Sequence, residues 1–205
     1  IVSIFIPIES DNGNLLYILG GILVGTLIGL SYSKKVKMTE IPELVSLFNG
    51  YGGACAVFIS ILEILKFQNT TSLGISIITY TALFVGCIAF TGSLVAYGKL
   101  SGKVKDWKSS ISSYFNLFWF SLCIGLIVFQ ILNPELYTFF PIIILVVSLL
   151  YGVSFVFPIG GADMPVVISL LNALTGIAAA LSGIVYDNMV MLLGGGSCRV
   201  FWHYS

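Results

Sequence analysis

Long apolar runs alternate with short polar stretches along almost the whole chain. Each run holds about 20 residues, the length at which a helix crosses the hydrocarbon core of a bilayer. A shorter apolar run at each end, residues 1–8 and 189–193, predicts part of a further span. The pattern predicts an all-α fold, a polytopic membrane helix bundle of about six complete spans plus partial ones at both ends. The complete spans are expected at residues 15–32, 42–65, 74–97, 112–132, 136–157 and 165–186.

Composition agrees with a membrane protein and excludes an ordinary soluble domain. Of 205 residues, 58% are hydrophobic and 9% are charged, whereas a soluble domain carries about 25% charged residues. The four cysteines show neither CxxC nor metal-ligand spacing, so no metal site is expected. No soluble catalytic motif is present, and the single histidine, His203, is expected to be idle. Nucleic acid is not expected as a partner.

The basic residues are distributed unevenly between the loops. Seven of the nine follow the first and third spans: Lys34, Lys35, Lys37, Lys99, Lys103, Lys105 and Lys108. Alternating topology puts both loops on one side, which the positive-inside rule makes cytoplasmic, or matrix in a mitochondrion. The turn at residues 160–163 falls on the same side. We therefore expect a multi-pass protein of the bacterial inner membrane, with the mitochondrial inner membrane as the alternative.

A sequence pattern occurs twice and links the second span to the sixth. Residues 41–56 and 164–179 align without gaps, with six identities in register: Pro42, Ser46, Leu47, Asn49, Gly53 and Ala56 match Pro165, Ser169, Leu170, Asn172, Gly176 and Ala179. In the sixth span the small residues, Gly183 included, recur every three or four positions and share one helix face. Such a face lets another helix approach closely. The repeat indicates two parallel helices with one role, and chance convergence on small residues is the alternative.

Polar residues within these spans are the candidate functional groups. An asparagine in lipid must find a hydrogen-bond partner, so Asn49 and Asn172, with Ser46 and Ser169, either line a path of waters or protons or form interhelical bonds. For Asn116 the interhelical bond is favoured. Glu40 and Asp163 precede the two repeated helices, where they either cap them or contact a soluble domain. Glu63, near the outer end of the second span, either reaches the membrane–water interface or is an entry point for protons.

Three long motifs, at residues 35–45, 90–103 and 160–172, resemble the membrane domain of the beta subunit of proton-translocating NAD(P) transhydrogenase. The resemblance covers about residues 9–193. It implies coupling of hydride transfer between NAD(H) and NADP(H) to proton movement, an alpha subunit as partner, a C-terminal NADP(H)-binding domain and a dimer of the assembled unit. Asn172 then matches an asparagine of the proton path, and Asp163 matches the acidic residue of the coupling loop.

The chain departs from this family in two respects. Some members carry a proton-handling histidine within the beta membrane helices, and residues 74–97 contain none. Members that take it from the alpha side have Asn-Gly in the second helix, as Asn49-Gly50 does here. The second departure is at the end of the chain. Residues 1–193 are expected to form a proton-channel domain, and residues 194–205 form an atypical tail that indicates truncation or a frameshift. We expect the fragment alone to bind no cofactor and to be inactive.

Two alternatives belong to other classes of protein. One is a small-solute or ion permease built on the repeated Pro-Asn-Gly helix, which would need no soluble partner. The other is a structural membrane anchor, in which leucine could replace the asparagines without any loss beyond stability. Solute uptake by the chain alone would favour the permease, and co-purification of an alpha-type subunit would favour the transhydrogenase.

Overall fold

The computed structural model describes residues 12–34, 36–66, 72–104, 112–133 and 139–200. Within these ranges every regular element is helical, which confirms the all-α prediction. The chain divides into two compact units, Ile1–Ile41 and Pro42–Ser205. The first unit contains α2 (Asn12–Ser33) and a short 3₁₀ turn at Met38–Glu40. Thr26 and Ser31 on α2 donate their hydroxyl hydrogens to carbonyls of the same helix, at 2.7 Å each.

Six α-helices make up the described part of the second unit, and most of the predicted spans coincide with them. They are α3 (Ile41–Lys66), α4 (Leu73–Leu100), α5 (Ser112–Leu132), α6 (Phe140–Val156), α7 (Met164–Val185) and α8 (Met189–Val200). Among the described residues, four helical segments have the length and composition to cross a membrane: 38–66, 73–100, 114–132 and 161–185. The number of complete spans stays a prediction, because α2 and α6 present shorter apolar stretches.

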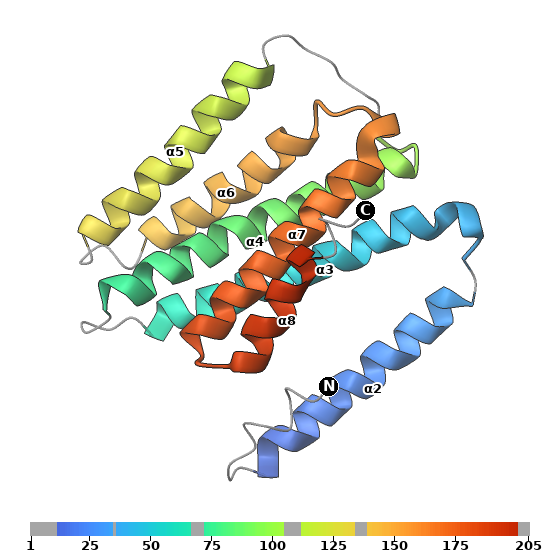
Figure 1. Cartoon of the computed structure of the whole chain (residues 1–205), viewed down its shortest axis with the longest axis horizontal. Helices are drawn as coiled ribbons and strands as arrows, with labels where there is room; N and C mark the ends of the chain where they lie inside the picture. Colours follow the sequence, from blue (N-terminus) through green and yellow to red (C-terminus); the bar gives the residue numbers. More distant parts are fainter. Residues whose placement is uncertain (1–11, 35, 67–71, 105–111, 134–138, 201–205) are drawn as a thin grey trace. The chain divides into compact units, whose positions relative to one another are not determined.

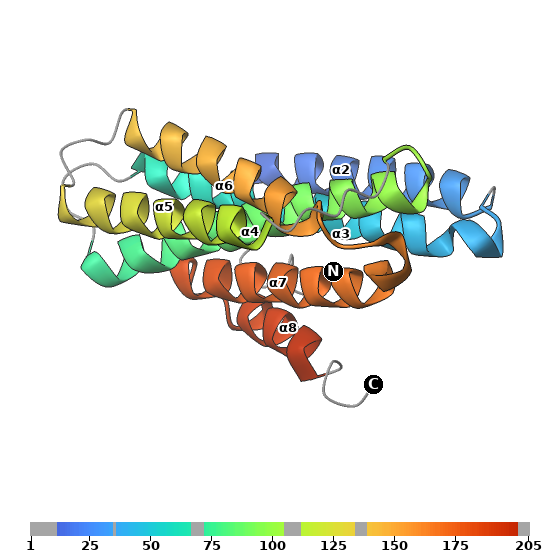
Figure 2. The same cartoon turned by 90° about the horizontal axis from the view of Figure 1, so that it is seen from above.

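Helix α4 lies in the middle of this unit, between α3, α6 and α7 (Figures 1 and 2). Glycines make these close contacts possible. A Cβ atom added at Gly53 of α3 would lie 2.7 Å from the Phe90 backbone nitrogen of α4, and one at Gly152 of α6 would lie 2.9 Å from the Ile88 Cα. Backbones at this separation gain dispersion contacts that larger side chains would prevent.

Aromatic and polar contacts join α4, α5 and α6. The Phe84 ring stacks on Tyr151 at 5.6 Å between centroids and tilts against Phe120 at 6.1 Å. The Ser154 hydroxyl of α6 donates to Asn116 Oδ1 of α5 at 2.6 Å. The prediction that Asn116 forms an interhelical hydrogen bond is therefore confirmed.

Helices α7 and α8 form a tight hairpin around Asp187, whose φ of 50° lies in the left-handed region. The Asn188 side chain then caps α8, because its Oδ1 accepts from the backbone nitrogens of Val190 and Met191 at 3.1 and 3.2 Å. Helix α8 continues through residues 194–200, beyond the apolar run expected to end at residue 193. Its 12 residues are fewer than the roughly 20 that cross a bilayer. The assignment of residues 194–205 as an atypical tail stays a prediction, and His203 lies outside the described residues.

Candidate functional site

A buried polar cluster lies between α3 and α4. Asn49 of α3 donates through Nδ2 to the Ser93 hydroxyl of α4 at 2.9 Å. One turn earlier, the Ser46 hydroxyl donates to the Ser93 carbonyl at the same distance. Asn49 is 9% exposed, while Ser46 and Ser93 are fully buried. Three polar side chains thus meet in the buried contact between the two helices.

The small residues of α3 explain why this cluster forms. Four small or polar residues lie on one side of α3, because they follow each other at spacings of three, one and three positions: Ser46, Asn49, Gly50 and Gly53. A Cβ at Gly50 would lie 3.3 Å from the Ser93 Cβ, so the absent side chain lets α4 approach. Ser93 itself was not among the predicted site residues. The signal for it was a small hydroxyl in an apolar run, within the motif at residues 90–103.

Asn172 is not part of this cluster, although it is the repeat partner of Asn49. Asn172 is exposed on α7, and its side chain makes no hydrogen bond with the described part of the chain. Ser169, one turn earlier, is half-buried. Helices α3 and α7 run in the same direction and touch where a Cβ at Gly52 would lie 3.0 Å from Thr175 Cγ2. Asn49 and Asn172 each precede that contact by one turn, so they lie at a similar depth on neighbouring helices.

The small and polar residues on one face of α7 form a row: Ser169, Asn172, Gly176, Ala179 and Gly183. The two glycines of this row lie against α8. A Cβ at Gly183 would lie 2.6 Å from the Leu192 backbone nitrogen, and the Gly176 carbonyl occupies the space that a Cβ at Gly195 would need. The two ends of this row therefore differ in their surroundings. Its glycine end packs on α8, and its polar beginning, Ser169 and Asn172, remains open.

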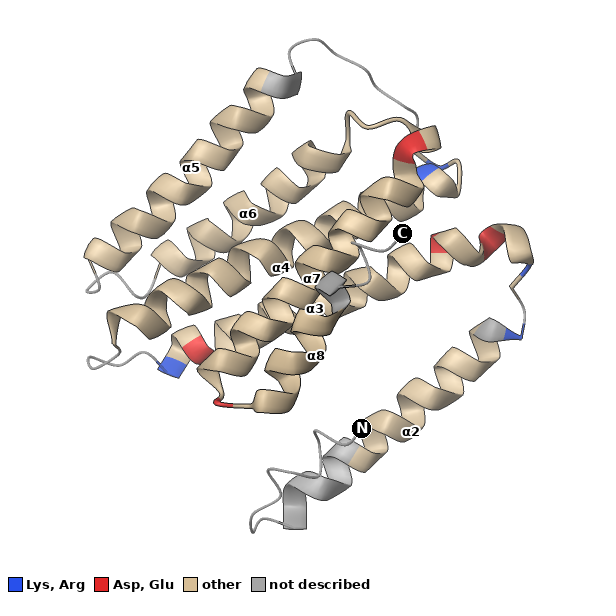
Figure 3. Ribbon diagram, viewed as in Figure 1, with Lys and Arg blue, Asp and Glu red and all other residues tan. Residues whose placement is uncertain are grey.

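The predicted docking residues lie at helix starts. Asp163 is exposed, occupies the N-cap position of α7, and makes no capping hydrogen bond through its side chain. Capping by the carboxylate, the simpler interpretation of this residue, is therefore not its role in this structure. Glu40, in the other unit, accepts a hydrogen bond from the Lys37 backbone nitrogen at 3.3 Å. Figure 3 shows the charged residues of the second unit gathered at helix ends and turns.

Lys99 fixes the segment that leads to Asp163. It is 7% exposed, and its ammonium donates to the carbonyls of Phe157 and Ile159 at 2.6 Å each. These carbonyls follow the end of α6, where a helix leaves acceptors unsatisfied and favours a cation. The sequence indicated Lys99 only as one of the loop charges. In the described ranges, no three histidine, cysteine or acidic side chains come together as a metal site would require.

Long apolar helices packed through glycines, with polar groups buried between them, define a polytopic α-helical membrane protein. Comparison with known proteins gives the family. The family model of the NAD(P) transhydrogenase beta subunit matches residues 1–199, and the chain belongs to that family. The beta subunit of NAD(P) transhydrogenase from Rhodospirillum rubrum is 34% identical over 191 residues, and the same subunit from a named strain of that species gives the same values. The match covers 87% of this chain and 40% of that relative.

Proposed function

We propose that this chain supplies the proton-conducting membrane part of an NAD(P) transhydrogenase, in which hydride transfer between NAD(H) and NADP(H) is coupled to proton movement. Family membership supports the enzyme, and the buried Asn49–Ser93–Ser46 cluster is the observation that carries the proton role. Buried polar groups in a membrane bundle are costly and commonly mark ion or proton pathways. The Asn49 amide and the two hydroxyls can bind and orient water.

The chain would provide the lining of the route rather than its titrating group. Neither asparagines nor serines change charge at physiological pH. Asn49 and Ser93 would hold water between α3 and α4. Asn172 and Ser169 would face a helix of another subunit. We assign that helix to the alpha subunit, which would bring the titrating side chain to the open face of α7.

Control of the route would come from the lysine-rich side. An NADP(H)-binding domain docked there would contact Asp163, Glu40 and the neighbouring lysines. Because Lys99 ties the loop before Asp163 to α4, a change at Asp163 could reach the helix that carries Ser93. The nicotinamide cofactors would bind in the partner domains of the complex. The complex would be a dimer of assembled units in a bacterial inner membrane, and this chain by itself would transfer no hydride.

The test is Asn172→Ala in a full-length beta subunit assembled with its alpha subunit. We expect proton-coupled turnover to fall about tenfold, the effect of losing roughly 1.4 kcal/mol of interaction. Asn116→Ala is the matched control, because Asn116 bonds Ser154 away from the cluster. Turnover unchanged by Asn172→Ala would remove this residue from the proton path, and solute uptake by the beta chain alone would favour a permease.

A further inference from the structure

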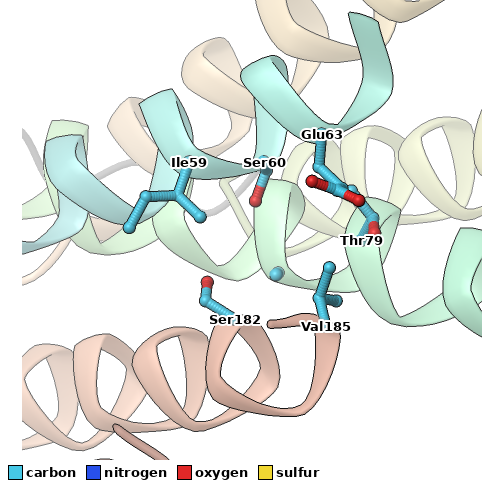
Figure 4. A pocket seen from close by; sticks show the side chains of 7 residues that line it. Ile59, Ser60, Glu63, Thr79, Ser182 and Val185 are labelled. Carbon is cyan, nitrogen blue, oxygen red and sulfur yellow. The ribbon is translucent and has the colours of Figure 1, made fainter. Parts of the chain in front are cut away.

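A second polar site lies at the end of the second unit opposite to Lys99 and the last turn of α4. It is a pocket between the last turns of α3, the second turn of α4 and the end of α7. Figure 4 shows Ser60 and Ser182 facing each other across it, with the Glu63 carboxylate beside Thr79. Glu63 follows Asn49 by 14 positions along α3, which places it about 21 Å further along the helix axis.

Thr79 is the first sign that this pocket binds something. Its side chain is 1% exposed, and its Oγ1 has no hydrogen-bond partner in the described structure. Two residues later, Thr81 shows the usual solution, since its Oγ1 donates to the Ile77 carbonyl at 2.7 Å. A buried hydroxyl without a partner costs about 1–3 kcal/mol. A water molecule admitted by a movement of Glu63 would supply the missing bond.

The other groups present acceptors toward the same space. The hydroxyl hydrogens of Ser60 and Ser182 are already donated to the Ala56 and Ala178 carbonyls, at 2.9 and 3.0 Å. Their oxygen lone pairs therefore remain for the pocket. An ionised Glu63 also only accepts. Apart from the Thr79 hydroxyl, the polar groups that line the pocket therefore only accept hydrogen bonds, and a water or a hydronium ion would bring further donors.

Glu63 connects the pocket to the surface. Its side chain is 18% exposed, and one carboxylate oxygen lies 3.2 Å from Lys66 Nζ, which is 62% exposed. Lys66 also lies over the Tyr186 ring beyond the end of α7, at 5.1 Å from the centroid. These two are the titratable groups that face Glu63 from α3 and α7, and the residues of α4 that line the pocket, Thr79 and Ala82, do not titrate. With Glu63 in this position, the free space inside is smaller than a water molecule.

We propose that this pocket is a water-binding site at the outer mouth of the proton route, and that Glu63 exchanges protons there with the outer solution. The proposal rests on the proposed function. A proton from a hydronium ion would move to a Glu63 carboxylate oxygen and leave a neutral water behind. Neutral Glu63 would release Lys66, open the pocket to water held by Thr79, Ser60 and Ser182, and pass its proton to an inward water.

Thiol labelling tests water access without depending on pumping. Thr79→Cys and Thr81→Cys are made separately in a full-length complex whose native cysteines are serine, and a membrane-impermeant methanethiosulfonate is added from the outer side. Both variants must retain hydride transfer, which shows that they fold. We expect Thr79→Cys to react at least about tenfold faster than Thr81→Cys, whose side chain does not line the pocket. Equal rates, or no reaction at position 79, would overturn the water site.

Conservative variants test the proton exchange. We expect Glu63→Gln to lower hydride-driven proton movement about tenfold, and Glu63→Asp to restore much of it. Glu43→Gln, a change at the opposite end of α3, should pump as the unmodified complex does. A labelled Thr79→Cys together with normal pumping by Glu63→Gln would overturn the role of Glu63. Failure of the proposed function would be distinguished by normal proton movement in the Asn49 and Asn172 variants.

Discussion

At the scale of single residues, the environment of each polar side chain distinguishes a structural role from a functional one. Asn116 meets one serine across a helix pair, as its sequence context favoured. Asn49 was left between a bond and a water path, and it bonds Ser93 while keeping its amide oxygen as an acceptor. Asn172 has the same local sequence but an exposed position. A local repeat fixes the helix face, whereas the neighbour on that face depends on the whole bundle.

Ser93→Ala tests the energy of the polar cluster. The change removes the acceptor of the Asn49 amide but leaves the Ser46 bond to the backbone, so we expect a loss of about 1–2 kcal/mol in the free energy of unfolding. Thermal unfolding of the purified chain in detergent measures it, as a fall in Tm of a few degrees. Ser31→Ala, which removes a hydroxyl that bonds within α2, is the control and should shift Tm far less. Equal shifts would mean that the cluster contributes nothing to stability.

At the scale of helices, hydrophobic runs predicted where most helices lie, but not which helices they contact. Helix α7 begins and ends within one residue of the predicted 165–186. Helix α4 extends three residues beyond the prediction. Lys99 bonds the segment after α6, and Gly98 lies against Val104 of the turn that follows α4. Helix α8 also passes the expected end at residue 193, because Gly195 packs on α7. These additions depend on tertiary contacts that apolar periodicity does not contain.

Gly53→Ala tests the close contact of α3 with α4. The new Cβ would lie 2.7 Å from a backbone nitrogen that no rotamer change can move. We therefore expect a destabilisation of about 1–3 kcal/mol. Gly20→Ala, where nothing described lies within 4 Å, should be neutral or slightly stabilising. Unfolding by denaturant compares the two; equal midpoints would contradict the close packing.

At the scale of the whole molecule, the second unit has two polar sites joined by α3. The Asn49–Ser93–Ser46 cluster lies nearer the end of α4 that carries Lys99, and the Glu63 pocket lies near the beginning of α4. Both occur where α3 contacts α4. The first could be predicted in part from the repeat, since Asn49 and Ser46 were named and Ser93 was not. The second could be predicted only through Glu63, which was named as reaching the interface or receiving protons. Thr79, Ser60 and Ser182 could not be grouped with it, because they come from three separate spans.

The most direct measurement is hydride-driven proton movement in proteoliposomes that contain the full-length beta subunit and its alpha subunit, with and without Asn49→Ala. A pH-sensitive dye follows acidification after both nicotinamide substrates are added. If the buried cluster carries protons, Asn49→Ala lowers the rate about tenfold at an equal amount of folded complex. An unchanged rate at equal protein would contradict the proton role of this membrane domain.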